Sequence, residues 1–299
     1  MENSLYWKRD YLVKTLSRTR RKDYENYVVN AIWNRLQCKY PLEIQPVTQQ
    51  CVRLKDGSHV LIDLFFPQVA IGIECDEAYH QNNHLHDMRR TDKIEEILSA
   101  YHPNSDFRLL RIDVSQSIEK IENEINKAAA MILAAYEKNP QPWRSYSDQW
   151  EKIRAEKRLT INNPFRFRTI VDICNCIGHS CKIMQRSYFS IGTKYQLWCP
   201  KLAIQRGDEK VAASTRGWIN ILSEDWTQII ESNPKREDIS VVKNVDKNRI
   251  VFAKSKDPIG QDGYRFVGVF RIWKSSAKQN IYEKVADQID FTDITASGV

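Results

Sequence analysis

The spacing of apolar residues predicts a mixed α/β domain in the first half of the chain. Over residues 21–37, apolar side chains recur at every fourth position, the spacing of one helix face: Tyr24, Val28, Ile32 and Leu36. The pattern also predicts strands at about 47–54, 59–66, 69–76 and 107–114, a polar helix at 83–100 and an amphipathic helix at 117–136. The resulting order, α-β-β-β-α-β-α, predicts a mixed sheet flanked by helices.

The second half of the chain follows a different pattern, in which short apolar runs are separated by Gly, Asp and Asn. Runs typical of strands lie at 195–202, 249–255 and 264–273, and one helix is predicted over 166–177. This predicts an α+β domain with a curved sheet or an open barrel. The intervening segment is rich in Pro, Ser and aromatic residues, as a linker would be. We therefore expect a first domain over 1–138, a linker over 139–158 and a second domain over 159–299.

Composition is that of a soluble globular protein, with 42% apolar and 28% charged residues. No run approaches the roughly 20 apolar residues of a membrane span. The N-terminal residues lack the apolar core of a signal peptide. The seven cysteines are odd in number and irregularly spaced, which argues against a disulfide framework. These observations together predict a cytoplasmic protein.

Positive charge is concentrated in the second half. The chain contains 45 Lys and Arg and 38 Asp and Glu; residues 1–140 hold 19 and 20 of them, so residues 141–299 hold 26 and 18. The second half is therefore the part that we expect to contact a polyanion such as DNA.

Three acidic residues lie inside the apolar strands predicted at 59–66 and 69–76: Asp63, Glu74 and Asp76. A charge buried in a strand is costly unless it is paired or binds a metal. Glu74 and Asp76 are two residues apart, so they project from the same face, and a hairpin would bring Asp63 beside them. The three carboxylates are candidate ligands for Mg²⁺, which prefers oxygen donors. Solvated charges at a sheet edge are the alternative interpretation.

Residues just after the second of these strands would supply the rest of a site for phosphodiester hydrolysis. Such a site must neutralise the phosphoryl oxygens, activate a water and stabilise the leaving alkoxide. Asp76 or Glu77 would complete the metal shell, and His80 would position or deprotonate the water. Arg90, on the helix predicted to follow, would bind phosphate or tether Asp87.

This arrangement resembles that of the very-short-patch-repair (Vsr)-like nucleases, which belong to the PD-(D/E)xK fold group. The resemblance rests on the strand with Asp63, the strand end IECDEAYH (73–80), the D-x-x-R at 87–90 and the late strand LLRIDV (109–114). In the usual motif a lysine stands at the position of Asp76, and its replacement favours the Vsr-like branch. The resemblance implies a catalytic cluster of Asp63, Glu74, Asp76, Glu77 and His80, and metal ligation by Asp63, Glu74, Asp76 and Glu25.

Four segments of the second half resemble the SRA-like domain of the PvuRts-type restriction endonucleases: MQRSYF (184–189), YQLWCPKL (195–202), GWINILSEDW (217–226) and YRFVGVF (264–270). Those enzymes join an N-terminal Vsr-like nuclease to a C-terminal SRA-like module, and the resemblance follows the same order over nearly the whole chain. It implies cleavage of DNA that carries 5-hydroxymethylcytosine or its glucosylated form, at a distance from the modified base.

Reading a modified base requires flipping it out of the duplex, stacking it on aromatic side chains and hydrogen-bonding its edge. Trp218 and Asn220 match the family's pocket motif and suit the stacking and hydrogen-bonding roles. Gln185, Tyr188 and Trp198 are further candidates for the base-binding pocket. Packing in the hydrophobic core is the alternative role for Trp198.

One cysteine-rich segment offers four possible zinc ligands, Cys174, Cys176, His179 and Cys181. Their spacing, C-x-C-x₂-H-x-C, is not a usual zinc-finger pattern. Buried, unpaired cysteines at the end of a helix are the favoured interpretation.

Taken together, the sequence predicts a Mg²⁺-dependent restriction endonuclease that acts on double-stranded DNA with modified cytosine, in defence against phage. One catalytic cluster per chain predicts a homodimer for cutting both strands. Two alternatives stay open: a modified-cytosine-binding protein with a degenerate nuclease domain, suggested by the missing lysine, and a mismatch-directed Vsr-like nickase.

Overall fold

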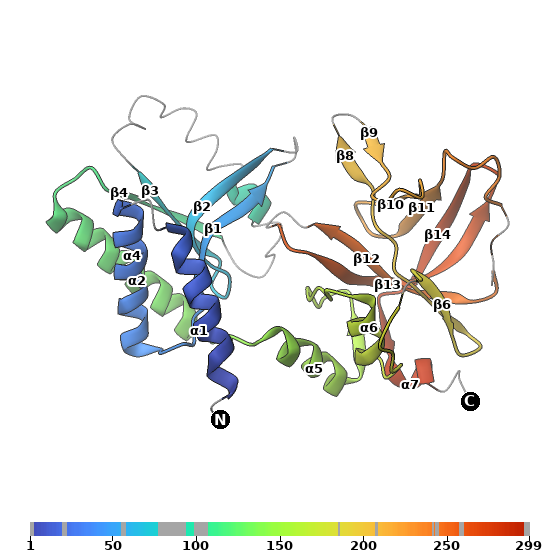
Figure 1. Cartoon of the computed structure of the whole chain (residues 1–299), viewed down its shortest axis with the longest axis horizontal. Helices are drawn as coiled ribbons and strands as arrows, with labels where there is room; N and C mark the ends of the chain where they lie inside the picture. Colours follow the sequence, from blue (N-terminus) through green and yellow to red (C-terminus); the bar gives the residue numbers. More distant parts are fainter. Residues whose placement is uncertain are drawn as a thin grey trace. The chain divides into compact units, whose positions relative to one another are not determined.

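The computed structural model describes residues 3–19, 23–54, 58–76, 94–98, 107–184, 186–206, 209–240, 242, 245–256 and 260–295 (Figure 1). The chain divides between Ser145 and Tyr146 into two compact units. Much of the segment predicted as a linker is regular structure, because helix α5 (Tyr146–Glu156) lies within it. Among the described residues, no helix combines the length and the apolar character needed to cross a membrane.

The N-terminal unit contains a four-stranded mixed sheet in the order β1-β2-β3-β4. The first three strands are antiparallel neighbours, and β4 pairs with β3 in parallel. The elements are α1 (Asn3–Leu16), a 3-10 turn (Ser17–Thr19), α2 (Asp23–Lys39), β1 (Val47–Arg53), β2 (His59–Phe66), β3 (Ile71–Asp76), β4 (Arg108–Asp113) and α4 (Ile118–Lys138). The predicted mixed sheet with flanking helices is present, and α1 is an additional helix.

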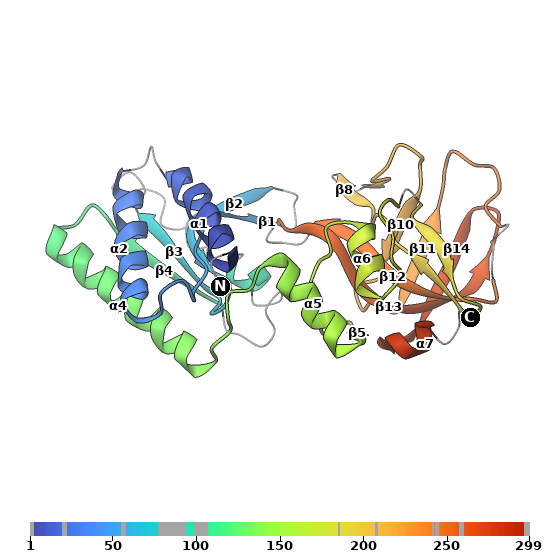
Figure 2. The ribbon, with the colours of Figure 1, turned by 60° about the horizontal axis from the view of Figure 1, so that its bottom comes forward.

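Helices α2 and α4 lie side by side and cover one face of this sheet (Figure 2). The other face is covered by a helical segment at residues 94–98, within the region predicted as a polar helix. Of the predicted apolar stripe on α2, Val28, Ile32 and Leu36 are completely buried. Tyr24 is 59% exposed, so its assignment to the buried stripe was wrong. The adjacent Glu25 is buried in its place, which brings a carboxylate against the sheet.

Strands β1 and β2 change face at the position of Asp63. A regular strand would place residues 60, 62, 64 and 66 on one face. Instead, Val60 and Ile62 pack with the 94–98 segment, whereas Leu64 and Phe66 pack with α2 and α4. The change coincides with Gln49, which lies opposite Asp63 on β1 and has a φ of 52°. Asp63 therefore lies at the point where the side chains of β2 cease to alternate between the two faces of the sheet as in a regular strand.

The C-terminal unit is built on a seven-stranded sheet in the order β10-β11-β14-β13-β12-β7-β6 (Figure 1). Only β7 and β12 pair in parallel. Its strands are β6 (Tyr188–Ile191), β7 (Tyr195–Trp198), β10 (Ile219–Leu222), β11 (Gln228–Ser232), β12 (Asn248–Lys256), β13 (Asp262–Ser275) and β14 (Gln279–Ala286). Around it lie β5 (Arg158–Thr160), α6 (Ile170–Cys176), β8 (Ile204–Arg206), β9 (Glu209–Val211), β15 (Gln288–Asp290) and α7 (Phe291–Thr295).

Register shifts interrupt the long strands β12, β13 and β14, at Val251/Phe252, Val269/Phe270 and Ile272/Lys274. Gly268 lies between two of them with a φ of 127°. A Cβ at this position would lie 2.9 Å from the carbonyl oxygen of Ala286, so only glycine fits. Such bulges bend strands and increase their twist.

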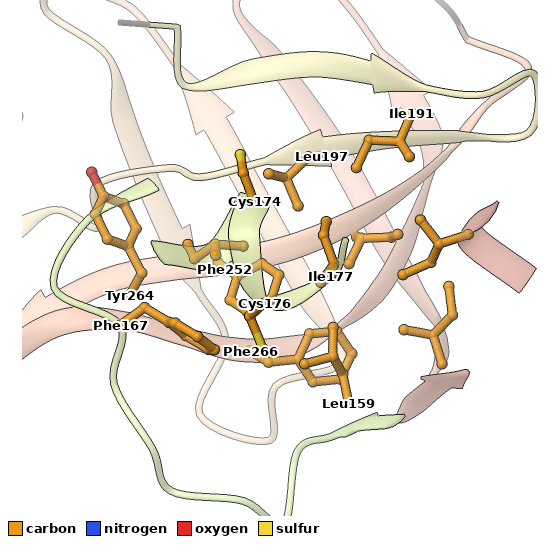
Figure 3. Close-up of a cluster of buried hydrophobic side chains, with 14 of the residues drawn as sticks. Leu159, Phe167, Cys174, Cys176, Ile177, Ile191, Leu197, Phe252, Tyr264 and Phe266 are labelled. Atoms are coloured by element: carbon orange, nitrogen blue, oxygen red, sulfur yellow. The ribbon is translucent and has the colours of Figure 1, made fainter. Parts of the chain in front are cut away.

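The two faces of this sheet carry separate apolar clusters. One face packs against α6 and contains Leu197, Phe252 and Phe266, together with Cys174 and Cys176 (Figure 3). Burial raises the pKa of both thiols to about 12. No group of three or more His, Cys, Asp or Glu in the described part of the chain is arranged to hold a metal. Cys174 and Cys176 are thus buried, unpaired residues of this core cluster, as the sequence predicts, and Cys181 is partly buried at its edge.

The opposite face, here called the Trp198 face, carries the second cluster: Trp198, Ile229, Val251, Ala253, Val267, Phe270 and Tyr282. It is formed from β7, β12, β13, β14 and β11, and Leu222 of β10 packs against its edge.

Candidate functional site

Asp63 and Glu74 lie on neighbouring strands of the N-terminal unit. The register Leu64↔Ile73 makes Asp63 and Glu74 the next opposing pair along β2 and β3. Asp63 accepts two hydrogen bonds, from Gln49 Nε2 to Oδ1 (3.0 Å) and from the Cys75 backbone N–H to Oδ2 (2.9 Å). The carboxylate is therefore fixed next to the strand that carries Glu74. The hairpin that was predicted to bring these acids together is present.

Glu25 joins this group from helix α2. It is 4% exposed, and its Oε1 accepts a hydrogen bond of 2.6 Å from Gln49 Nε2. One amide nitrogen thus donates to both Glu25 and Asp63. Glu25 lies in the first turn of α2, where the partial positive charge of a helix N-terminus attracts a carboxylate. The predicted proximity of a helical acid to the strand carboxylates agrees with this contact.

Arg111 on β4 is a site residue that the sequence analysis missed. Its Nε and Nη2 donate to the two oxygens of Asp76 at 2.7 and 2.6 Å, a bidentate pair. Its Nη1 lies 3.9 Å from Glu74 Oε2. The parallel register Glu74↔Arg111 places it there. The only signal in the sequence was a single arginine within the apolar strand LLRIDV. The partner of this arginine could not be identified without knowing how the strands pair.

These contacts determine how the carboxylates fit a cation. Within the described residues, Asp76 is engaged by Arg111 and Gln49 lies between Glu25 and Asp63, so no preassembled three-ligand cluster is found there. Asp63 and Glu74 nevertheless occupy opposing positions on β2 and β3 and offer carboxylate oxygens, the donor type that Mg²⁺ prefers. Their chemistry fits a hard divalent cation. Glu77, His80, Asp87 and Arg90 lie outside the described residues.

A second group of polar side chains lies on the Trp198 face of the C-terminal unit. Each member is two residues from an apolar member of that face, so it projects from the same side. We call these residues the polar row: Gln196, Asn220, Glu231, Arg249 and Asn280. Four of them are at most 7% exposed, and Glu231 is partly exposed. Five polar groups beside an apolar cluster require partners, because an unpaired buried polar group is costly.

Strand register arranges the polar row in two lines. Asn220, Glu231 and Asn280 are consecutive partners across β10, β11 and β14. Gln196 and Arg249 are partners across β7 and β12. Aromatic rings lie between the two lines, since Trp198 and Tyr282 contact each other with ring centroids 4.8 Å apart.

Of the two polar atoms of the Asn220 side chain, one has a hydrogen-bond partner among the described residues. Its Nδ2 donates to the Lys201 carbonyl at 3.1 Å, whereas its buried Oδ1 has no partner among the described residues. Nearby, Trp218 is partly exposed and the Arg236 guanidinium lies 5.3 Å from its ring centroid. Asn220 thus presents a free acceptor, and Trp218 a partly accessible ring.

An open cavity of about 240 Å³ lies on the same face. Its lining combines apolar residues such as Leu222, Trp226 and Val267 with polar ones such as Arg265 and Glu224. Leu222 is two residues beyond Asn220 on β10, so Asn220 points toward the same side of the sheet. Concave spaces lined by apolar groups with a few polar ones are typical of ligand sites.

Comparison with known proteins identifies both units. Residues 9–153 match the family model "Restriction endonuclease PvuRts1 I-like, N-terminal", and residues 152–291 match the SET and RING associated (SRA) domain. The chain thus joins a PvuRts1 I-like N-terminal domain to an SRA domain. The family resemblance predicted from the sequence is confirmed.

A solved structure, that of the 5-hydroxymethylcytosine-specific restriction enzyme AbaSI, is similar along the whole length. The sequences are 26% identical, the match covers 96% of this chain and 98% of that chain, and the TM-score is 0.64. Curated protein sequences gave no match.

In the PvuRts1 I-like domain, the structure brings together Asp63, Glu74 and Glu25, and it pairs Asp76 with Arg111. The predictions for Glu77 and His80 fall outside the described residues.

In the SRA domain, Asn220 and Trp198 lie on the same face, and Trp198 is 5% exposed within the apolar cluster. Tyr188 is 50% exposed on β6. Gln185 lies outside the described residues. The sequence analysis missed Glu231 and Arg249. Each is a single polar residue in a strand, and only the pairing of the strands shows that they belong to the polar row.

Proposed function

We propose that this protein is a restriction endonuclease that cleaves double-stranded DNA containing 5-hydroxymethylcytosine or its glucosylated form. The PvuRts1 I-like domain would break the strand, and the SRA domain would read the modified base. The observation that carries the proposal is the end-to-end similarity to AbaSI, together with the match of each half to a domain of the expected type.

For strand cleavage we propose Asp63 and Glu74 as the ligands of Mg²⁺, with Asp76, Glu77 and Glu25 as further ligands and His80 as the residue that positions or deprotonates water. Bound Mg²⁺ would neutralise the phosphoryl oxygens and lower the pKa of a water. Gln49 holds Asp63 in place through its 3.0 Å hydrogen bond, and Arg111 adds positive charge next to Glu74. This arrangement supports membership of the Vsr-like branch of the PD-(D/E)xK group.

For base reading we propose that a flipped cytosine lies against the Trp198 face. Trp218 would stack on the base, and the unpaired Oδ1 of Asn220 would accept from its edge. Glu231, the strand partner of Asn220, would be a second acceptor. Tyr188 and Gln185 are proposed as further contacts of the modified nucleotide. Trp198 would form the floor through its contact with Tyr282.

We also propose where the DNA is cut, how many copies of the protein take part and what the reaction is for. We propose that cleavage occurs at a distance from the modified base, because reading and cutting belong to different domains. One catalytic cluster per chain supports a homodimer for double-strand cleavage. An anti-phage role in the cytoplasm follows from the substrate, since modified cytosine distinguishes foreign DNA from host DNA.

Digestion of matched phage DNAs tests the proposal. With Mg²⁺, DNA that carries hydroxymethylated or glucosylated cytosine should be cut, whereas plain DNA should stay intact under the same conditions. Unmodified mismatched duplexes should also stay intact. Equal cutting of plain, methylated, hydroxymethylated and glucosylated DNA would contradict modification dependence, and cutting of the mismatched duplex alone would favour a nickase.

A second candidate function is modified-cytosine binding without cleavage. It is favoured by Asp76, which occupies the position of the usual lysine and is neutralised by Arg111. In the leading proposal, Arg111 supplies the cation that the missing lysine would provide. The two candidates therefore differ in what Arg111 is expected to do.

Replacing Arg111 with alanine should lower the cleavage rate roughly 10- to 100-fold, the usual effect of losing a group that supports metal ligands. Arg111→Lys should restore part of the rate because it keeps the charge but not the bidentate geometry. The rate would be measured on hydroxymethylated DNA at saturating protein. Arg35→Ala, which removes an ion pair with Glu122 in the same domain, is the matched control. Wild-type cleavage by Arg111→Ala would exclude Arg111 from the site.

A further inference from the structure

The polar row contains hydrogen-bonding capacity that the protein does not use. Gln196 Oε1 and Asn220 Oδ1 are buried acceptors with no donor among the described residues, and both side chains are at most 5% exposed. Beside Gln196 lies Arg249, a guanidinium that is 7% exposed. Buried groups of this kind normally find partners, so their arrangement on one face indicates a ligand that supplies them.

Arg249 is connected to Glu231 through an aromatic ring. The Arg249 guanidinium lies 4.2 Å from the centroid of the Tyr282 ring and 5.3 Å from that of Trp198, within the range of cation–π attraction. The Tyr282 hydroxyl donates to Glu231 Oε2 at 3.1 Å. Arg249, Tyr282 and Glu231 therefore form a continuous chain that ends at the strand partner of Asn220.

The ionisation of Glu231 depends on this chain. Burial raises the pKa of Glu231 above its ordinary value, while Arg249, Tyr282 and Asn280 act in the opposite direction. The charged or titratable groups that act on it from the described elements are Arg249 on β12 and Tyr282 on β14; Asn220 on β10 and Asn280 on β14 are neutral. An ionised Glu231 can only accept hydrogen bonds, whereas a protonated one can also donate.

The protonation state of Glu231 would affect which base the SRA pocket can bind. Cytosine carries an amino group at C4, a donor, whereas thymine and its derivatives carry an oxygen there, an acceptor. An ionised carboxylate and the Asn220 Oδ1 would both favour the amino group and repel the oxygen. A protonated Glu231 could donate to that oxygen, and the distinction would weaken.

We propose that Arg249 is a positioning residue that keeps Glu231 a pure hydrogen-bond acceptor, so that the SRA pocket selects amino pyrimidines over oxo pyrimidines. The inference rests on the proposed function, since it assumes that the base lies against the Trp198 face. Arg249 acts through Tyr282 and Glu231 and need not touch the base.

The test is a binding measurement with the full-length protein in the absence of divalent metal. The probes are duplexes with a single 5-hydroxymethylcytosine, a single 5-hydroxymethyluracil or plain cytosine at the same position. The readout is the ratio of the dissociation constants of the first two from about pH 5 to about pH 8. For the wild type, selectivity should be high near neutral pH and fall as Glu231 becomes protonated at low pH. In Arg249→Met, selectivity near neutral pH should drop roughly 10-fold, and the midpoint of the pH profile should move upward.

Three variants separate positioning from a general loss of structure. Arg249→Lys keeps the charge and should retain a midpoint close to that of the wild type. Tyr282→Phe removes the hydrogen bond to Glu231 and should shift the midpoint upward as well. Arg271→Met removes an exposed arginine from β13 and should change neither ratio nor midpoint.

The outcomes distinguish this inference from the proposed function. If the wild type binds hydroxymethylated and plain cytosine equally, the proposed function fails. If it prefers the modified cytosine but Arg249→Met and Tyr282→Phe keep the wild-type midpoint and ratio, the role of Arg249 is overturned. Should Arg249→Met not fold, the midpoint of Tyr282→Phe decides the question.

Discussion

Asp63→Asn should abolish DNA cleavage while binding of hydroxymethylated DNA stays at the wild-type level. Asp63 is one of two adjacent carboxylates proposed to hold Mg²⁺, and both of its oxygens are fixed by hydrogen bonds. Asparagine keeps the size and one acceptor oxygen but removes the charge that a hard cation requires. The expected loss is about a thousandfold or more in rate, or roughly 4 kcal/mol of transition-state stabilisation. Single-turnover cleavage with Mg²⁺ measures it.

The control for this prediction is Glu122→Gln, which removes one negative charge from the same domain and breaks the ion pair with Arg35. It should cleave at nearly the wild-type rate. A thermal unfolding curve for each variant would verify that both are folded. Full cleavage by Asp63→Asn would mean that the metal ligands lie elsewhere in the domain.

Asn220→Ala should remove most of the preference for modified cytosine. The Asn220 Oδ1 is a buried acceptor with two lone pairs, so it can accept from both the C4 amino group and the adjacent 5-hydroxymethyl group. Plain cytosine lacks the second donor, so loss of Oδ1 should lower discrimination roughly 10- to 100-fold. The measurement is the ratio of dissociation constants for hydroxymethylated and plain duplexes, because a ratio cancels general effects on DNA affinity. The nuclease domain keeps its own chemistry, so any residual cleavage should spread to plain DNA.

Asn233→Ala is the matched control. Asn233 is 4% exposed, close to the 5% of Asn220, but both ends of its amide are used within the protein. Its replacement should lower the midpoint temperature of unfolding, since a satisfied buried amide is lost. It should leave the binding ratio unchanged. A fall of equal size in both variants would assign the effect of Asn220 to structure rather than to reading.

Features that repeat locally could be predicted from the sequence. The strands at 47–53, 59–66 and 71–76 lie within or close to the predicted ranges, because alternating or continuous apolar runs carry their own signal. Asp63 and Glu74 could be identified as candidate site residues because they are charged residues within such apolar runs. Helix α1 lacks a strong apolar stripe and was not predicted.

Contacts that depend on strand register could not be predicted. Arg111 is 35 residues from Asp76 in the chain, and only the parallel pairing of β3 and β4 brings them together. The same holds for Glu231 and Asn220, and for Arg249 and Gln196. Tyr24 fits the helical spacing of its neighbours, but the stripe on α2 is rotated toward Glu25.

The left-handed backbone of Gln49 has a consequence for engineering. A residue other than glycine pays an energetic penalty in this conformation, on the order of 1 kcal/mol. Glycine would relieve the penalty but would remove the amide that donates to Glu25 and Asp63. A library screened for heat resistance would thus be drawn toward glycine at this position, and one screened for cleavage would retain glutamine. Stability and activity are opposing demands on this single residue.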